Sequence, residues 1–202
     1  MIRVLEAAFV TTAVGTEGWP AGGVPEVAFV GRSNVGKSSM INALTGRRKL
    51  VRVSSTPGRT RTLNFFDVGL ERETERRTVR LADLPGYGFA KVSKAERAAW
   101  EAMITGYLQG RDVLRGVVAI IDAEVGPTED DVRTLAYLVR ASRPVLVAAT
   151  KLDRLAKARR KPRLWEAAAR LSVPRDTVIG FSATEKLGVA EVWEALWNVT
   201  AE

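Results

Sequence analysis

The chain has 202 residues, of which 46% are apolar and 27% charged, and it contains no histidine and no cysteine. These absences exclude a Ser-His-Asp triad, a cysteine nucleophile, a disulfide and a zinc site built from His or Cys. The net charge is +8, and residues 1–100 carry +7 of it. A basic chain without cysteine favours a cytoplasmic protein that meets a polyanion.

The length suits one domain with a core of its own. We therefore expect residues 1–202 to form a single domain, with residues 1–25 as an N-terminal extension, and we expect a monomer. No apolar run approaches the ~18 residues of a membrane span. The first residues lack the pattern of a signal peptide, so no contact with a membrane is expected.

Short apolar, β-rich runs alternate with longer helical stretches along the chain. The runs predict strands at residues 27–30, 62–68, 78–84, 116–121, 144–149 and 177–181. Helices are predicted at residues 37–46, 93–108, 128–141, 163–171 and 189–199, and loops at 16–25, 47–58, 69–77 and 154–162. This alternation indicates an α/β fold with a mostly parallel, six-stranded sheet and helices on both faces.

One glycine-rich loop fits a phosphate-binding pattern in full. Residues 31–38 read Gly-Arg-Ser-Asn-Val-Gly-Lys-Ser and lie between a predicted strand and a predicted helix. Backbone N–H groups of such a loop surround an anion, and the helix N-terminus adds its positive dipole end. Lys37 can reach the β- and γ-phosphates, and Ser38 offers a hydroxyl to Mg²⁺. The expected phosphate-binding residues are Gly31, Ser33, Asn34, Val35, Gly36, Lys37, Ser38 and Ser39.

Two later motifs complete the nucleotide site. Asp83 ends a predicted strand and can hold Mg²⁺, while the N–H of Gly86 can reach a γ-phosphate. Thr150-Lys151-Leu152-Asp153 follows another strand, where the Asp153 carboxylate can accept both the N1–H and the 2-amino group of guanine. Adenine lacks this donor pair, so the carboxylate selects GTP over ATP. Phe181-Ser182-Ala183 follows the last strand and can present N–H groups to the guanine O6.

In this order, the motifs resemble those of Ras-like GTPases of the translation-factor class. The stretches at residues 25–39, 54–66 and 83–90 narrow the resemblance to the EngB/YihA (YsxC) GTPases of bacteria. It covers nearly the whole chain, and it implies a single-domain GTPase that assists assembly of the large (50S) ribosomal subunit. The GTP-bound and GDP-bound forms then act as a switch.

The resemblance also assigns residues that spacing alone leaves open. Gly58 and Thr60 match the first switch loop, which makes Thr60 the second Mg²⁺ hydroxyl, with Thr62 as the alternative. Asn34 matches an asparagine that helps to hold a potassium ion in related GTPases, so K⁺ is a candidate second ion. We expect Lys37, Thr60 and Gly86 to contribute most directly to hydrolysis.

Tyr87 stands where Ras-like proteins carry the glutamine that positions the attacking water. A phenol cannot donate to and accept from that water as an amide does. The sequence therefore predicts slow hydrolysis by the isolated protein, with a partner or an ion that completes the site.

Two runs rich in cations are candidates for contact with ribosomal RNA. Residues 47–61 hold Arg47, Arg48, Lys49, Arg52, Arg59 and Arg61, and residues 154–163 hold Arg154, Lys157, Arg159, Arg160, Lys161 and Arg163, with no acid in either run. The five tryptophans are expected to be core or helix anchors. Two alternatives stay open: a P-loop enzyme of another class, such as a nucleotide kinase, and a nucleotide-gated module for protein interaction without RNA contact.

Overall fold

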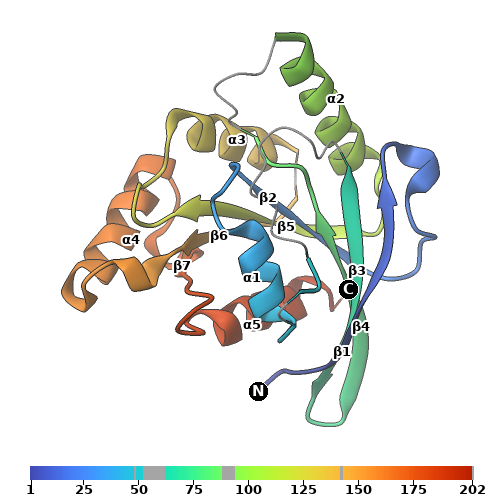
Figure 1. Cartoon of the computed structure of the whole chain (residues 1–202), viewed down its shortest axis with the longest axis horizontal. Coiled ribbons are helices and arrows are strands. Elements are labelled where there is room, and N and C mark those ends of the chain that lie inside the picture. Colours follow the sequence, from blue (N-terminus) through green and yellow to red (C-terminus); the bar gives the residue numbers. More distant parts are fainter. Residues whose placement is uncertain (48, 52–61, 88–93, 142, 202) are drawn as a thin grey trace.

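The computed structural model describes residues 1–47, 49–51, 62–87, 94–141 and 143–201 (Figure 1). Its strands are β1 (Arg3–Ala13), β2 (Glu26–Gly31), β3 (Leu63–Arg72), β4 (Glu75–Asp83), β5 (Leu114–Asp122), β6 (Val145–Thr150) and β7 (Val178–Gly180). Its helices are α1 (Lys37–Leu44), α2 (Lys94–Gly110), α3 (Glu129–Arg140), α4 (Lys157–Leu171) and α5 (Val189–Val199). All seven strands form one sheet in the order β1-β3-β4-β2-β5-β6-β7.

The sheet is parallel from β4 to β7 and antiparallel at the other edge, where β3 pairs with both β1 and β4. The predicted six strands are all present. The seventh is β1, which belongs to the predicted N-terminal extension. Most of its residues are at least partly exposed, so they lack the continuous apolar pattern that identifies the buried strands.

Helices cover both faces of the sheet, as predicted (Figure 1). Strand β2 shows why, because its side chains alternate between two separate cores. Ala28 and Val30 pack into the core beneath α2, α3 and α4. Val27 and Phe29 pack into the core beneath α1 and α5. A strand buried on both faces must be apolar throughout, as this one is.

The predicted loop at residues 69–77 is wrong. These residues extend β3 and β4 into a hairpin whose turn places Glu73 at φ 57°. Opposite charges face each other across the two strands, with Glu71 opposite Arg76 and Arg72 opposite Glu75. Such cross-strand pairs stabilise an exposed ribbon, but their polarity makes the sequence look like a loop.

The predicted boundary of α4 is also wrong. The helix begins at Lys157, so most of the predicted loop at residues 154–162 is helical and Pro162 lies inside the helix. Proline usually ends a helix pattern in sequence analysis because it lacks an N–H donor. Here it is exposed, so water can reach the carbonyl group that loses its intrahelical partner.

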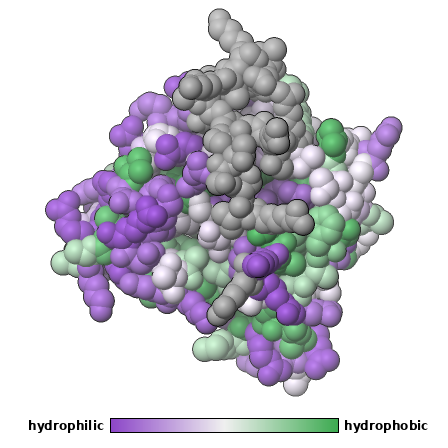
Figure 2. All heavy atoms as spheres, viewed as in Figure 1, coloured by the Kyte–Doolittle hydropathy of each residue, from purple (hydrophilic) through white to green (hydrophobic). Residues whose placement is uncertain are grey.

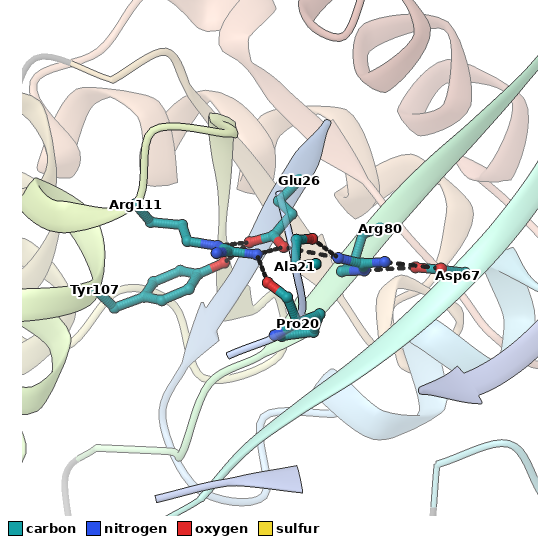
Figure 3. A network of polar contacts seen from close by, with 7 residues as sticks. All are labelled: Pro20, Ala21, Glu26, Asp67, Arg80, Tyr107 and Arg111. Carbon is teal, nitrogen blue, oxygen red and sulfur yellow. Dashed lines mark hydrogen bonds and ion pairs between the residues drawn. The ribbon is translucent and has the colours of Figure 1, made fainter. Parts of the chain in front are cut away.

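A buried polar cluster connects the sheet to α2 on the side away from the phosphate loop. Glu26 at the start of β2 is fully buried and accepts hydrogen bonds from Arg111 and from the Tyr107 hydroxyl (Figure 3). Arg80 contacts Glu26 and binds Asp67 through two hydrogen bonds of 2.6 and 2.9 Å. The two arginines also donate to the carbonyl groups of Pro20 and Ala21.

Candidate nucleotide-binding site

The sequence motifs meet at the carboxyl edge of the parallel strands. The glycine-rich loop follows β2, Asp83 ends β4, residues 150–153 follow β6, and residues 181–183 follow β7. Strand β2 lies between β4 and β5 in the sheet. Ligands of open parallel sheets bind at this edge, so the order of the strands assembles one site from segments distant in sequence.

The glycine-rich loop has the shape of an anion cradle. Asn34 and Gly36 both have positive φ angles, of 63° and 99°. Left-handed residues in such a turn direct neighbouring N–H groups into a concavity. Gly36 also packs against Thr150, whose side chain lies 3.4 Å from the position of an added Cβ. Helix α1 begins at Lys37, so its N-terminus faces the same cradle.

Lys37 and Asp83 form an ion pair in this site, with side chains that are 12% and 7% exposed. The pair joins the first turn of α1 to the end of β4. The Lys37 ammonium shows that a cation can sit against the Asp83 carboxylate. Carboxylate and hydroxyl oxygens are the hard ligands that Mg²⁺ prefers, and Ser38 follows in the same turn of α1. The donor set therefore fits a magnesium ion shared with phosphate oxygens.

Gly86 lies directly against the phosphate loop. A Cβ added there would come within 3.0 Å of the Ser33 Oγ and 3.3 Å of the Gly31 carbonyl oxygen. The next residue extends the contact, because the Ser33 N–H donates to the Tyr87 carbonyl at 3.0 Å. A side chain at this position would push the two segments apart by a few tenths of an ångström, so glycine favours the approach that brings the backbone of the Asp83–Gly86 motif beside the phosphate loop.

The Tyr87 side chain points away from the phosphate loop. Its hydroxyl donates to Asp131 Oδ1 at 2.7 Å, and its ring packs edge-on against Trp100. Burial and then the nearby Asp131 carboxylate raise the pKa of Tyr87. Asp131 also forms a capping box with Thr128 at the start of α3. The spacing of Thr128 and Asp131 is typical of such a cap, but nothing in the sequence pattern indicates Tyr87 as its third member.

The predicted base-reading loop is tied to the phosphate loop. Thr150 donates to the carbonyl groups of Val35 and Ile121. Lys151 has a left-handed backbone, at φ 58°, and its ammonium donates to the Asn34 carbonyl oxygen at 3.0 Å. A second acceptor, Asp122 Oδ2, lies 2.6 Å from the same ammonium. Asp153 is the middle residue of the short helix η2 (Leu152–Arg154) and is partly exposed at this edge.

Some backbone groups of residues 181–183 form hydrogen bonds within the protein, and another remains available at the site. The Phe181 carbonyl accepts from the Leu152 N–H at 3.1 Å, which joins this segment to the base-reading loop. The Ser182 N–H donates to the Leu187 carbonyl at 3.1 Å. Within the described residues, the Ala183 N–H donates to no backbone carbonyl group outside the regular elements. Of the two predicted donors, it is therefore the one that remains available to a ligand.

Several predicted residues lie outside the described part of the chain. Gly58 and Thr60 do, and so do four cations of the first basic run, at positions 48, 52, 59 and 61. Thr62, the alternative Mg²⁺ ligand, directly precedes β3. The choice between Thr60 and Thr62 therefore stays a prediction.

The second basic run is more neutral than its sequence indicates. Three of its cations have acidic partners in space: Arg154 pairs with Glu124, Arg160 with Glu185 and Arg163 with Glu166. In the described structure Lys157, Arg159 and Lys161 form no ion pair, and all three are exposed. Hydrophilic residues dominate this part of the surface, at the left of Figure 2.

The tryptophan prediction holds for most members but not for Trp165. Trp193 and Trp197 are 2% and 4% exposed, and Trp19 and Trp100 pack against the core. Trp165 on α4 is 39% exposed and lies near the Lys161 ammonium and the Arg175 guanidinium. An exposed tryptophan at helical spacing cannot be distinguished from a buried one without knowing which face of the helix meets the sheet.

The fold and the site together define the class of protein. Residues 26–151 match the family model described as "50S ribosome-binding GTPase". A P-loop GTPase of Ras-like fold was predicted, and this class is confirmed; the predicted strand count was one too few. In the described residues, no helix has the length and apolar character needed to span a membrane.

Individual relatives narrow the class to a family. A Myxococcus xanthus protein named "Probable GTP-binding protein EngB" is 67% identical, covering 97% of this chain and 95% of that protein. A protein of the same name from Anaeromyxobacter dehalogenans (strain 2CP-C) is 52% identical, covering 100% and 94%. The crystal structure of a probable GTP-binding protein engB shares the fold, with a TM-score of 0.63, 23% identity and coverage of 87% and 98%. The chain belongs to the EngB family of GTP-binding proteins, and it is a GTP-hydrolysing enzyme.

Proposed function

We propose that this GTPase is a cytoplasmic switch that assists assembly of the large ribosomal subunit. The observation that carries the proposal is the match of residues 26–151 to the family model described as a 50S ribosome-binding GTPase, supported by the nucleotide-binding motifs that meet at the sheet edge. The whole chain is proposed to act as one GTPase domain, with β1 from residues 1–25 as the edge of its sheet.

In the proposed complex, the loop at residues 31–38 binds the phosphates and Lys37 leaves Asp83 for the β- and γ-phosphate oxygens. Asp83, Ser38 and Thr60 would hold Mg²⁺, which supplies charge stabilisation to the phosphates when bound. The Gly86 N–H donates to the γ-phosphate. Asp153 selects guanine, the stem of Lys151 lies along the base, and the Ala183 N–H meets the O6 atom.

Hydrolysis by the isolated protein is proposed to be slow. The reaction transfers the γ-phosphoryl group of GTP to water, which must be held in line with the bond that breaks. The Tyr87 hydroxyl is engaged by Asp131, so it does not hold this water. Turnover well below the ~10 s⁻¹ of a median enzyme is expected, and a rate near that value would contradict the proposal.

A bound cation is one candidate for the missing component. Asn34 lies beside the phosphate cradle with its carbonyl oxygen on Lys151, and we propose that its side chain helps to hold K⁺ there. The expected result is faster turnover in K⁺ than in Na⁺ at equal ionic strength. An Asn34→Ala variant should lose this difference, whereas equal rates in both salts for the wild type would count against potassium.

Contact with ribosomal RNA is proposed for both basic runs, at residues 47–61 and 154–163. In the second run, we expect Lys157, Arg159 and Lys161 to contact the RNA phosphates, because the other three cations already have acidic partners. A polyanion releases counterions when lysine and arginine bind its phosphates, so the affinity should fall steeply with salt.

The deciding experiment is cosedimentation with large-subunit precursor particles, with either a GTP analogue or GDP present. We expect binding that depends on the nucleotide, that weakens as salt is raised, and that decreases in a variant with Lys157, Arg159 and Lys161 changed to Ala. A matched control changes Arg154, Arg160 and Arg163, the cations that already have acidic partners. Nucleotide-dependent binding to a protein alone, with no affinity for the particles, would favour the alternative of an interaction module without RNA contact.

A further inference from the structure

Asp122 is a buried carboxylate that belongs to none of the recognised motifs. It ends β5 directly beside Thr150 at the end of β6, and it is 3% exposed. Its Oδ1 atom accepts the N–H groups of Glu124 and Val125 at 2.8 and 3.2 Å. Its Oδ2 atom accepts the Lys151 ammonium at 2.6 Å. The Oδ1 atom thus stabilises the turn after β5, and the Oδ2 atom binds the base-reading loop.

Lys151 is the residue that needs such support. Its side chain is a flexible four-carbon stem with a point charge, and it loses rotamer entropy when it is fixed. In the described structure it has two acceptors, the Asn34 carbonyl and Asp122. The carbonyl comes from the phosphate loop and the carboxylate from β5, so acceptors from two separate segments hold the ammonium.

The Asp122 carboxylate keeps its charge in the folded protein. Burial alone would raise the pKa of Asp122, but the Lys151 ammonium and the Val125 N–H outweigh it, and the pKa is lowered. A charge-assisted hydrogen bond at this length is stronger than a neutral one. The carboxylate is therefore ionised throughout the physiological range of pH.

We propose that Asp122 is a positioning residue for recognition of the guanine base. It fixes the Lys151 ammonium, so that the lysine stem is already placed for contact with the plane of the base. The entropy lost in ordering the stem is then lost when the protein folds, and not when the nucleotide binds. Asp122 acts through Lys151 and does not touch the nucleotide. The inference rests on the proposed role of residues 150–153 in reading the base.

The substitution Asp122→Asn separates the two tasks of the carboxylate. The amide oxygen of asparagine can still accept the N–H groups of Glu124 and Val125. Its NH₂ group then faces the Lys151 ammonium, donor against donor, so only the link to the base-reading loop is lost. Asp112→Asn is the matched control, because Asp112 is exposed and lies just before the other end of β5.

The test measures the affinity for fluorescent GDP in a double-mutant cycle with Lys151→Ala. Asp122→Asn should weaken GDP binding about tenfold in the wild-type background, as expected for the loss of a hydrogen bond between charged groups. In the Lys151→Ala background the same change should have little further effect, because no ammonium is left to position. Asp112→Asn should leave the affinity unchanged in both backgrounds.

Two outcomes would overturn the inference: no loss of affinity in Asp122→Asn, or the same loss with and without Lys151. The second would mean that Asp122 serves only the turn after β5. If Asp122→Asn does not fold, Asp122→Glu gives the same cycle, since it keeps the charge but displaces it by one methylene. Failure of the base-reading role itself is seen separately, as an Asp153→Asn variant that keeps its preference for GDP over XDP.

Discussion

At the scale of single residues, we propose that Asp153 determines the choice of base. Its carboxylate can accept from N1–H and the 2-amino group of guanine, whereas xanthine carries a carbonyl at position 2. We expect Asp153→Asn to weaken GDP binding by roughly 10²-fold or more and to strengthen XDP binding, because an unmatched buried polar group discriminates strongly.

Competition of GDP and XDP against a fluorescent nucleotide measures this exchange. Asp176→Asn is the control, since Asp176 is exposed and lies in a different turn, before β7. An Asp153→Asn variant that binds both nucleotides as the wild type does would assign base selection to another residue.

Tyr87 gives the second prediction at this scale. Tyr87→Phe removes only the hydroxyl that donates to the buried Asp131, a hydrogen bond to a charged group worth about 1.5–3 kcal/mol. The free energy of unfolding should fall by that amount in urea titration. The rate of GTP hydrolysis well below the unfolding midpoint should stay the same, because the hydroxyl points away from the phosphates. A large drop in rate without loss of stability would place Tyr87 in the reaction instead.

The residues of the site differ in whether a local sequence pattern or a contact between distant residues identifies them. Gly31 to Ser38 and residues 150–153 could be found from the sequence because each set is contiguous and its spacing reflects one local backbone shape. Asp122 could not, since its partner Lys151 is 29 residues away and any strand can end in aspartate. The side-chain direction of Tyr87 depended in the same way on where α3 packs.

At the scale of elements, the N-terminus of α3 has a side-chain cap, which the N-termini of α1, α4 and α5 lack. Thr128 caps it and Asp131 closes the capping box from inside. Thr128→Ala should destabilise the protein by about 1 kcal/mol, whereas Thr128→Ser keeps the capping oxygen and should cost little. Urea titration of the two variants checks the difference, and equal losses would show that the methyl group, and not the cap, stabilises this end.

The capping box shares Asp131 with Tyr87, so the two changes should not be additive. Combining Thr128→Ala with Tyr87→Phe leaves Asp131 buried without either side-chain hydroxyl. Residues that share one buried partner couple by about 0.5–3 kcal/mol. A simple sum of the two single losses would contradict a common network.

Elements could be predicted from the sequence where a single pattern was present. The prediction failed where residues typical of a helix and residues typical of a loop occurred together. The buried strands β2, β5 and β6 are continuous apolar runs, and the runs have no other explanation in a chain of this composition. The start of α4 was misplaced because its first turns carry cations and a proline, both typical of loops. Packing of its apolar face against β7 and the core overrides that local preference.

At the scale of the whole molecule, the Glu26 cluster connects elements at the amino end of β2, away from the nucleotide site at its carboxyl end. It joins β2, the β3–β4 hairpin, the segment before β2 and the C-terminal end of α2 around one carboxylate (Figure 3). The carboxylate is fully buried, and a charge so placed is tolerated only with partners. The sequence could not predict this cluster, because Glu26, Arg80 and Arg111 come together only once the sheet order is fixed.

Glu26→Gln tests whether this carboxylate holds the fold together. The substitution keeps the shape but leaves Arg111 and Arg80 near an uncharged amide, and loss of one partner of a buried ion pair costs about 3–5 kcal/mol. The urea midpoint should fall accordingly, while Glu75→Gln, which removes only exposed charge pairs at the end of the hairpin, should lower it far less. Adding Arg111→Met to Glu26→Gln should recover part of the loss, since it removes one uncompensated cation. If the double variant is less stable than Glu26→Gln alone, Arg111 stabilises the fold through its bond to the Pro20 carbonyl and its packing on Trp19 more than through its charge.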